Sequence, residues 1–174
     1  MNTTKYYSFL PLMLTFALWL AVWITPESSY ALQQFNTDGK TNTNLFTTGN
    51  TTSIVSSTTE DGTAFNSFSI FDVHPGYTGN LIVPTTTENL IVLVNDTYPE
   101  STNNSPSLIE GTLNALKGGQ VGENIYLLNP FGISFSDTAV INAGSFTAIT
   151  PTRDFMDGFF ESFRNPLDSA VDAI

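Results

Sequence analysis

Short apolar runs separated by polar corners dominate the chain from residue 32 onward. The segments TTSIVSST and FNSFSIF partly alternate between apolar and polar positions, which is typical of strands with one face toward solvent. The segments LIVLV and IYLL are continuously apolar, which favours strands buried on both faces. Thr, Val, Ile and Phe favour strands, whereas Asn, Gly, Asp and Pro mark the turns between them. The pattern therefore predicts an all-β fold.

The runs predict a series of strands with no helix among them. No sustained helical period occurs between Leu32 and Thr150, and Asn114 to Lys117 is too short to count as a helix. Strands are expected over Thr51 to Thr58, Phe65 to Val73, Asn80 to Val83, Leu90 to Val94, Leu108 to Leu113, Ile125 to Leu128, Ile133 to Phe135, Ala139 to Ile141 and Phe146 to Ile149.

The connections between the predicted strands bear on the architecture. Many short strands joined by tight corners suit a sandwich, a barrel or a parallel β-helix. Between Leu32 and Thr150, the Asn-Gly and Asp-Gly pairs that favour two-residue hairpins are limited to Asp38-Gly39 and Asp61-Gly62. From Leu108 onward the strands recur at short, uneven intervals, which fits successive faces of a solenoid better than a meander of hairpins.

The most regular corner is Asn129-Pro130-Phe131-Gly132, which lies between two predicted strands. Asn at the first position, Pro at the second and Gly at the fourth match a type I β-turn. Pro130 fixes φ at the second position, and the Asn129 side chain can hydrogen-bond the backbone two residues on. The sequence predicts a strand, a tight turn and a second strand beginning at Ile133.

The first 31 residues are predicted to be a secretory signal peptide. Lys5 supplies a thin positive region, Phe9 to Ile24 is an apolar run of 16 residues, and Ser29-Tyr30-Ala31 supplies small residues for cleavage before Leu32. The alternative is an uncleaved membrane anchor, but 16 residues fall short of the ~20 that a spanning helix needs, and Pro11 interrupts the run. Cleavage would leave one β domain over residues 32–152.

Residues 153–174 form a different, acidic and aromatic segment. Phe155, Phe159 and Phe163 recur at i, i+4 and i+8, which predicts one apolar face of a short helix. Large aromatic side chains favour a covered position over a solvated one. The segment is therefore expected to be either a cap over the end of the β core or the start of further β structure in a longer chain.

Composition excludes several classes of function. The net charge of −11 leaves no basic patch for the phosphates of a nucleic acid or for an anionic membrane. Acidity in an exported protein mainly favours solubility. The sequence has no cysteine and a single histidine, His74, so neither a metal site nor a bound cofactor is expected.

No catalytic constellation is recognisable either. The acidic pairs Asp154/Asp157 and Glu60/Asp61 lack an acid–base partner and are expected to be exposed charges. His74 could join a charge relay with Asp72, but no nucleophile motif accompanies it, and histidine before Pro-Gly is more simply a turn residue. The chain is therefore expected not to be an enzyme.

An ordered set of motifs resembles a known family. The corner Asn129-Pro130-Phe131-Gly132-Ile133 follows an apolar strand, is preceded by Ile-x-Gly-x-Leu at Ile109, Gly111 and Leu113, and is followed by Ile-Asn-x-Gly-Ser-Phe at Ile141 to Phe146. Upstream, AFNSFSIFDVHPGYTGNLIVP resembles the aromatic strands of the same family, and ENLIVLVND resembles its following buried strand. Together these segments cover roughly Thr51 to Phe160 and are similar to the amino-terminal secretion (TPS) domain of two-partner-secretion exoproteins. These are the filamentous-haemagglutinin-like adhesins and haemolysins of Gram-negative bacteria, also known as TpsA proteins.

The resemblance implies a right-handed, single-stranded parallel β-helix with an amino-terminal cap and strands outside the helix. It implies a secretion and folding-nucleation domain that a TpsB-type outer-membrane transporter recognises through its POTRA domains while the chain is extended. The protein would then reach the cell surface or medium through the periplasm and outer membrane, and residues 129–133 would be the recognition motif. Phe131 stands where the family motif has a second Asn, and Ser136 where a Gly is common.

A second hypothesis is a stand-alone secreted binding module. An acidic, Thr- and Asn-rich β surface with exposed aromatic residues could bind host glycans or a cell surface in the manner of an adhesin. Its aromatic platforms would be Tyr77, Tyr98 or the phenylalanines of the carboxy-terminal segment. Glycan binding by the purified protein without any transporter would distinguish this hypothesis from the first.

Overall fold

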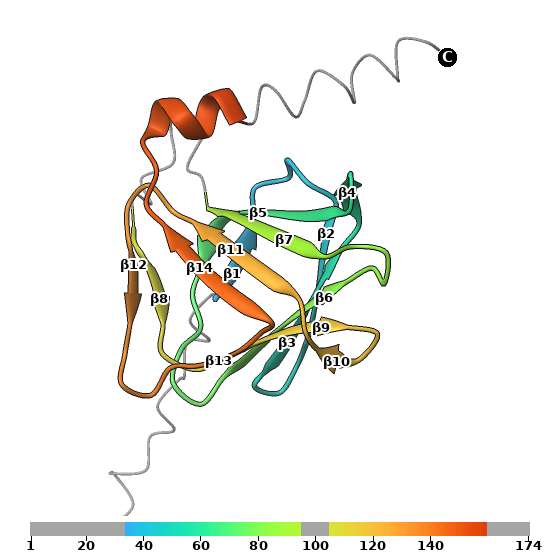
Figure 1. Cartoon of the computed structure of the whole chain (residues 1–174). Helices are drawn as coiled ribbons and strands as arrows, with labels where there is room; N and C mark the ends of the chain where they lie inside the picture. The colour runs from blue at the N-terminus through green and yellow to red at the C-terminus, as the bar shows by residue number, and fades with distance from the viewer. Residues whose placement is uncertain (1–33, 95–104, 160–174) are drawn as a thin grey trace, which may run out of the picture. The chain divides into compact units, whose positions relative to one another are not determined.

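The computed structural model describes residues 34–94 and 105–159 (Figure 1). The chain divides into two units, Met1–Leu32 and Gln33–Ile174, and all described residues belong to the second. The predicted signal peptide (residues 1–31), Tyr98 and Phe163 lie outside the described residues. Within the described ranges, no helix is long and apolar enough to cross a membrane.

Three β-sheets make up most of the described structure, and one short helix follows them over residues 153–159. The first sheet contains β1 (Phe35–Thr37), β4 (Thr58–Glu60), β5 (Thr63–Phe71), β7 (Asn89–Val94), β11 (Asn124–Leu128) and β14 (Ser145–Ile149). The second contains β2 (Thr43–Thr48), β3 (Thr51–Ser56), β6 (Thr78–Val83), β9 (Thr112–Lys117), β10 (Gln120–Val121) and β13 (Val140–Asn142). The third pairs β8 (Ser107–Ile109) with β12 (Ile133–Phe135).

The chain runs repeatedly through the sheets, and we call each such run a pass. Successive passes pair in parallel with one another in all three sheets. Strands β5, β7, β11 and β14 are parallel neighbours in the first sheet, and β3, β6, β9 and β13 in the second. The chain visits the sheets in a constant order: β6, β7 and β8, then β9, β11 and β12, then β13 and β14. Antiparallel pairs join β1 and β4 to β5, β2 to β3, and β10 to β9, so the two large sheets are mixed, and neither is closed. The all-β prediction is confirmed.

Most predicted strands are present, and the differences have local causes. The strand predicted over Leu108 to Leu113 is wrong, because the chain turns at Glu110-Gly111 and forms β8 before the turn and β9 after it. Hairpin Asp61-Gly62 is confirmed: Glu60 pairs with Thr63, and both turn residues have positive φ. Strands β1, β2, β4 and β10 were not predicted, since they are short or polar; β10 follows a Gly-Gly hairpin at residues 118–119.

The main core lies between the inner faces of the sheets. Alternating residues of β3, β6 and β9 are buried, and they meet buried residues of β5, β7 and β11. The fully buried members include Ile54, Leu81, Leu90, Leu113 and Ile125. Burying each such side chain contributes roughly 1.5–3 kcal/mol, so the stacked passes stabilise one another through a continuous apolar interior.

The first sheet is also covered on its outer face, as its continuous apolar runs predict. Leu93 of β7 and Leu128 of β11 form a second buried cluster with Met156 of the helix. Thr152 caps the helix by accepting a hydrogen bond from the Phe155 amide (3.3 Å). The predicted apolar face is confirmed at Phe159, which packs against this cluster, and wrong at Phe155, which is 53% exposed while Met156 is fully buried in its place.

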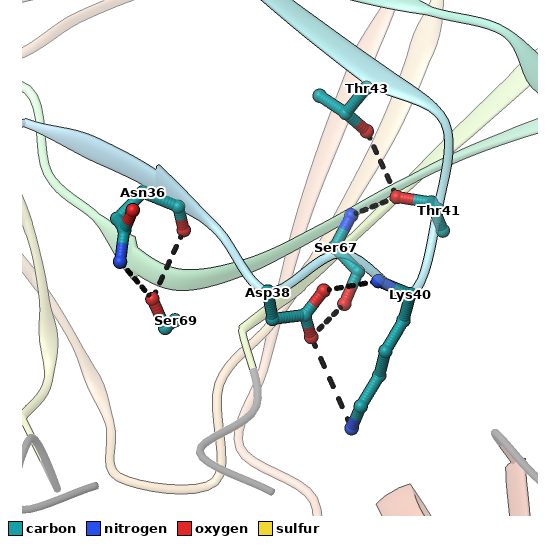
Figure 2. A network of polar contacts seen from close by, with 7 residues as sticks. All are labelled: Asn36, Asp38, Lys40, Thr41, Thr43, Ser67 and Ser69. Atoms are coloured by element: carbon teal, nitrogen blue, oxygen red, sulfur yellow. Dashed lines mark hydrogen bonds and ion pairs between the residues drawn. The ribbon is translucent and has the colours of Figure 1, made fainter. Parts of the chain in front are cut away.

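Polar side chains fasten the amino-terminal segment to β5 (Figure 2). Ser67 is buried; its hydroxyl donates to Asp38 Oδ2 (2.5 Å), and its amide donates to Thr41 Oγ1 (2.8 Å). Asn36 Nδ2 donates to Ser69 Oγ (2.7 Å), further along β5. Asp38 also accepts from the Lys40 amide (3.0 Å) and lies 4.0 Å from the Lys40 ammonium. Together with the backbone bond from the Asp38 amide to the Ser67 carbonyl (3.4 Å), these bonds hold residues 36–41 against β5.

Candidate functional site

The predicted corner joins β11 to β12 and adopts the expected turn. The Gly132 amide donates to the Asn129 carbonyl (3.2 Å), which closes the four-residue turn. The Phe131 amide donates to Asn129 Oδ1 (2.9 Å), which is the predicted bond from the side chain to the backbone two residues on. Pro130 lies at the second position and is half-buried. The turn geometry is therefore confirmed.

Asn129 is fully buried, and every polar atom of its side chain is used. Besides accepting from Phe131, it donates through Nδ2 to Ser107 Oγ (3.0 Å) and to the Ser105 carbonyl (3.3 Å) of the preceding pass. Its backbone amide donates to the Ile149 carbonyl of the following pass (3.1 Å). Asn129 therefore ties three passes of the chain together, and the folded corner does not present its amide to a partner.

Gly132 and Ile133 complete the corner. Gly132 has φ of +113°, which residues with a side chain rarely adopt, so glycine is needed here beyond its usual preference at the end of a turn. Its carbonyl accepts from the Ser107 amide (3.0 Å), which begins the pairing of β12 with β8. Ile133 packs against the main core but is only half-buried. A charged side chain at residue 133 should therefore lower the free energy of unfolding by less than it would at a fully buried position of an apolar strand.

Phe131, the residue that departs from the family motif, contacts the helix. Arg153 places its guanidinium 4.7 Å from the centre of the Phe131 ring, within the range of a cation–π interaction. The two residues are 22 positions apart in the sequence. The helix that carries Arg153 also packs on the first sheet. The sequence offered no signal for this pair, and it links the corner to the carboxy-terminal helix.

The two flanking motifs also mark places where backbones approach closely. A Cβ at Gly111 would lie 2.4 Å from the His74 carbonyl oxygen and 2.5 Å from that of Tyr77. A Cβ at Gly144 would lie 2.5 Å from the Gly122 carbonyl oxygen. Only glycine fits at either position, so both motifs serve the stacking of one pass on the next.

His74 pairs with Glu110 rather than with Asp72, the partner that a charge relay would need. His74 Nδ1 lies 3.7 Å from Glu110 Oε2, whereas Asp72 Oδ1 accepts from the Leu108 amide (2.8 Å). Burial raises the pKa of the Asp72 carboxyl, and the hydrogen bond from Leu108 opposes that rise. Within the described ranges, no group of three or more metal-ligating side chains is placed to hold an ion. Tyr77, a predicted aromatic platform, is half-buried.

An ion pair between a buried glutamate and a partly exposed lysine lies between the start of β11 and the end of β9. Glu123 is 1% exposed, and its Oε2 lies 3.8 Å from Lys117 Nζ. The Lys117 ammonium also donates to the Thr87 carbonyl. Glu123 Oε1 has no hydrogen-bond partner among the described protein atoms. Burial raises the pKa of the Glu123 carboxyl above its ordinary 4.5, and the Lys117 charge only partly offsets this.

The contribution of Glu123 to stability is expected to increase as pH falls from neutral toward 4.5. The pKa of Glu123 is higher in the folded chain than the ordinary 4.5. At pH values between the two pKa values, the folded state therefore holds a proton that the unfolded state has lost. Stability from this group is therefore lost as pH rises through the raised pKa; a tenfold difference in proton affinity between the two states corresponds to about 1.4 kcal/mol. Urea unfolding of the wild type and Glu123→Gln at pH 7 and pH 5 measures the difference.

The wild type should gain stability relative to Glu123→Gln on acidification. Asp72 has a raised pKa in both proteins, so its effect cancels in the comparison. Glu60 is exposed, and Glu60→Gln serves as the matched control that should follow the wild type. Equal pH dependence of the wild type and Glu123→Gln would contradict the expectation.

Comparison with known protein families gives a match. The family model described as the TPS secretion domain matches residues 33–170, which include the corner, both glycine motifs and the helix. None of the curated proteins and none of the solved structures matches the chain.

Proposed function

This chain belongs to the family of TPS secretion domains, and we propose that it is the part of a two-partner exoprotein that a TpsB-type outer-membrane transporter recognises. The observation that carries the proposal is the family match over residues 33–170. The family's role is secretion across the outer membrane rather than catalysis, in line with the expectation that the chain is not an enzyme. POTRA domains of the transporter would be the periplasmic partner, and the product would be released to the cell surface or medium.

The proposed fold is a right-handed parallel β-helix whose three faces are the three sheets. Its support is the constant order in which the chain visits the sheets and the parallel register between successive passes. The antiparallel strands β1, β2, β4 and β10 would be the amino-terminal cap and the strands outside the helix. A solenoid of this kind adds one pass at a time onto the last, so it can fold progressively as the chain emerges.

The corner motif would act in two states of the chain. In the extended chain, residues 129–133 expose side chains that a transporter could bind. In the folded chain, the Asn129 amide is bonded to Ser107, Ser105 and Phe131 and is buried. Recognition of Asn129 would therefore precede folding, and folding would release the motif from the transporter by burying it.

Residues 153–174 remain either a cap or the start of a longer β structure. Support for a cap comes from the docking of Met156 on the first sheet. Support for continuation comes from the exposed apolar side chains Phe135, Val140 and Ile149 on the last strands β12 to β14. An adhesin-like role of the exoprotein would belong to such a continuation or to a surface of this domain.

Export should depend on the transporter. The full chain is produced in a Gram-negative host with a matched TpsB-type transporter, with the same transporter inactivated, and without it. We expect the protein in the medium only with the active transporter, and its amino-terminal residue should be Leu32 if the signal peptide is cleaved as proposed. Retention in the periplasm in all three strains, with the transporter shown to export its own substrate, would exclude the proposed function.

A further inference from the structure

The outer face of the second sheet carries three regular rows of uncharged side chains. On β3 and β6, residues alternate between buried and half-buried, so the half-buried ones point away from the core. The strand register aligns these outward residues from strand to strand. The rows are a threonine row (Thr48, Thr51, Thr78, Thr112), an amide row (Ser53, Asn80, Asn114, Asn142) and an aliphatic row (Val55, Ile82, Leu116, Val121). We call this the neutral face.

The amide row is ordered and still has hydrogen-bonding capacity. Asn114 Nδ2 donates to Asn80 Oδ1 (2.8 Å), and Asn142 Nδ2 donates to Asn114 Oδ1 (2.7 Å). A side-chain amide has two N–H groups and two acceptor positions, so Asn114, which makes a ladder bond on each side, still keeps one N–H group and one acceptor position for another partner. Neighbouring strands lie about 4.8 Å apart, so these groups repeat at a constant interval across the face.

Apolar surface accompanies the polar rows. Phe46 of β2 is 63% exposed and pairs with Ser53 at the edge of the amide row. Val121 of β10, 51% exposed, extends the aliphatic row beyond Leu116. The face therefore offers hydroxyl and amide groups in rows, together with an aromatic ring and an aliphatic strip.

Charge restricts what can occupy this face. No residue of the three rows is ionisable, although the chain carries 16 acidic residues and a net charge of −11. Lys117, at the end of β9, directs its ammonium to Thr87 and Glu123. An anionic partner would be repelled by the chain as a whole, a cationic one would find no counter-charge on the face, and a second copy would bring two chains of −11 together.

We propose that the neutral face binds a neutral polysaccharide. A polymer of uncharged sugars repeats hydroxyl groups along its length, as the threonine and amide rows repeat their donors and acceptors. Its C–H surfaces would lie against Phe46 and the aliphatic row. This site is distinct from the platforms predicted from the sequence, Tyr77, Tyr98 and the carboxy-terminal phenylalanines, and it does not depend on the proposed secretion function.

The test is affinity electrophoresis of the purified full chain in native gels that contain dextran, mannan or hydroxyethyl cellulose. Because the chain is strongly acidic and these polymers are uncharged, binding slows the protein without an electrostatic contribution from the gel. We expect retardation by at least one of them. The dissociation constant should increase at least tenfold in Phe46→Ala, which removes an exposed ring, and in Ser53→Asp, which places a charge in the amide row.

Two matched variants control for side-chain size and charge. Phe135→Ala removes another exposed ring, and Thr147→Asp adds a charge at an exposed position of the first sheet; both should bind like the wild type. Unfolding curves of each variant separate loss of binding from loss of fold, and Phe46→Ala alone carries the test if Ser53→Asp unfolds. Four results would overturn the proposal: no retardation by any neutral polymer, retardation that both face variants retain, retardation only by anionic alginate or heparin, or a dimer that Phe46→Ala dissociates.

Discussion

Replacing Asn129 by alanine is expected to lower the free energy of unfolding by roughly 2–4 kcal/mol. The side chain is buried, and its loss leaves the Phe131 amide, the Ser107 hydroxyl and the Ser105 carbonyl without their partner. Each buried group that loses its partner costs about 1–3 kcal/mol, less where a neighbour or water can replace it. Urea unfolding of the purified protein measures the change.

Asn44→Ala is the matched control for this variant. Asn44 is exposed on β2, so its replacement should change the free energy of unfolding by no more than about 0.5 kcal/mol. A loss below about 1 kcal/mol for Asn129→Ala would mean that the corner relaxes or that water replaces the side chain. In that case Asn129 would not hold the three passes together.

The same variant separates recognition from folding when Ser107→Ala is measured beside it. Ser107→Ala removes the main partner of the Asn129 amide but leaves residues 129–133 unchanged. Ser107→Ala shows how much export is lost for a given loss of stability when the motif itself is intact. If the transporter binds Asn129 in the extended chain, Asn129→Ala should lose more export than its loss of stability alone would cause. If export follows stability alone in both variants, Asn129 is a structural residue and the proposed recognition by its side chain is excluded.

Gly111→Ala is expected to cause a loss of stability of roughly 3 kcal/mol or more. The new Cβ would meet two backbone carbonyl oxygens, at 2.4 and 2.5 Å, and neither can rotate away as a side chain could. The neighbouring backbone is fixed as well, because the Gly111 amide donates to the Val73 carbonyl (2.8 Å) and its carbonyl accepts from the Val140 amide (3.0 Å). Relief of the clash would therefore break the stacking of consecutive passes.

Gly122→Ala is the control for a glycine without such a neighbour. No atom lies within 4 Å of a Cβ built at residue 122, so this change should be neutral or slightly stabilising through the unfolded state. Thermal and urea unfolding of both variants give the comparison. A Gly111→Ala protein as stable as Gly122→Ala would show that the turn between β8 and β9 can shift.

Local sequence patterns predicted the strands and the corner, but not the partners that the corner acquires. The bond from Asn129 to the Phe131 amide follows from a rule that involves two neighbouring residues. Its bond to Ser107 joins residues 22 positions apart, and no local rule anticipates such a contact. The same holds for the Arg153–Phe131 pair and for the neutral face, which exists only because the register aligns separate strands.

Glycine was the residue type whose role was least predictable from the sequence. Gly132 was expected from turn statistics alone, yet its φ of +113° makes it a requirement. Gly111 lay inside a predicted strand and instead ends it, because close packing against the His74 and Tyr77 carbonyls leaves no room for a side chain. Burial of the continuously apolar strands on both faces was predictable, whereas the choice of Met156 over Phe155 as the residue that covers them was not.

The pairing of each pass with the previous one sets a distance that the chain must travel before it can fold. Asn80 bonds to a residue 34 positions further on, and Asn114 to one 28 positions further on. Extended chain spans about 3.3 Å per residue, so 34 residues reach roughly 110 Å, well beyond the ~30 Å hydrocarbon thickness of a bilayer. A strand can pair on one edge with the pass before it, but its other edge stays open until a whole further pass has followed it. If the chain crosses the outer membrane through a transporter as proposed, the time that this further pass takes to emerge is the shortest time for which the edge stays open.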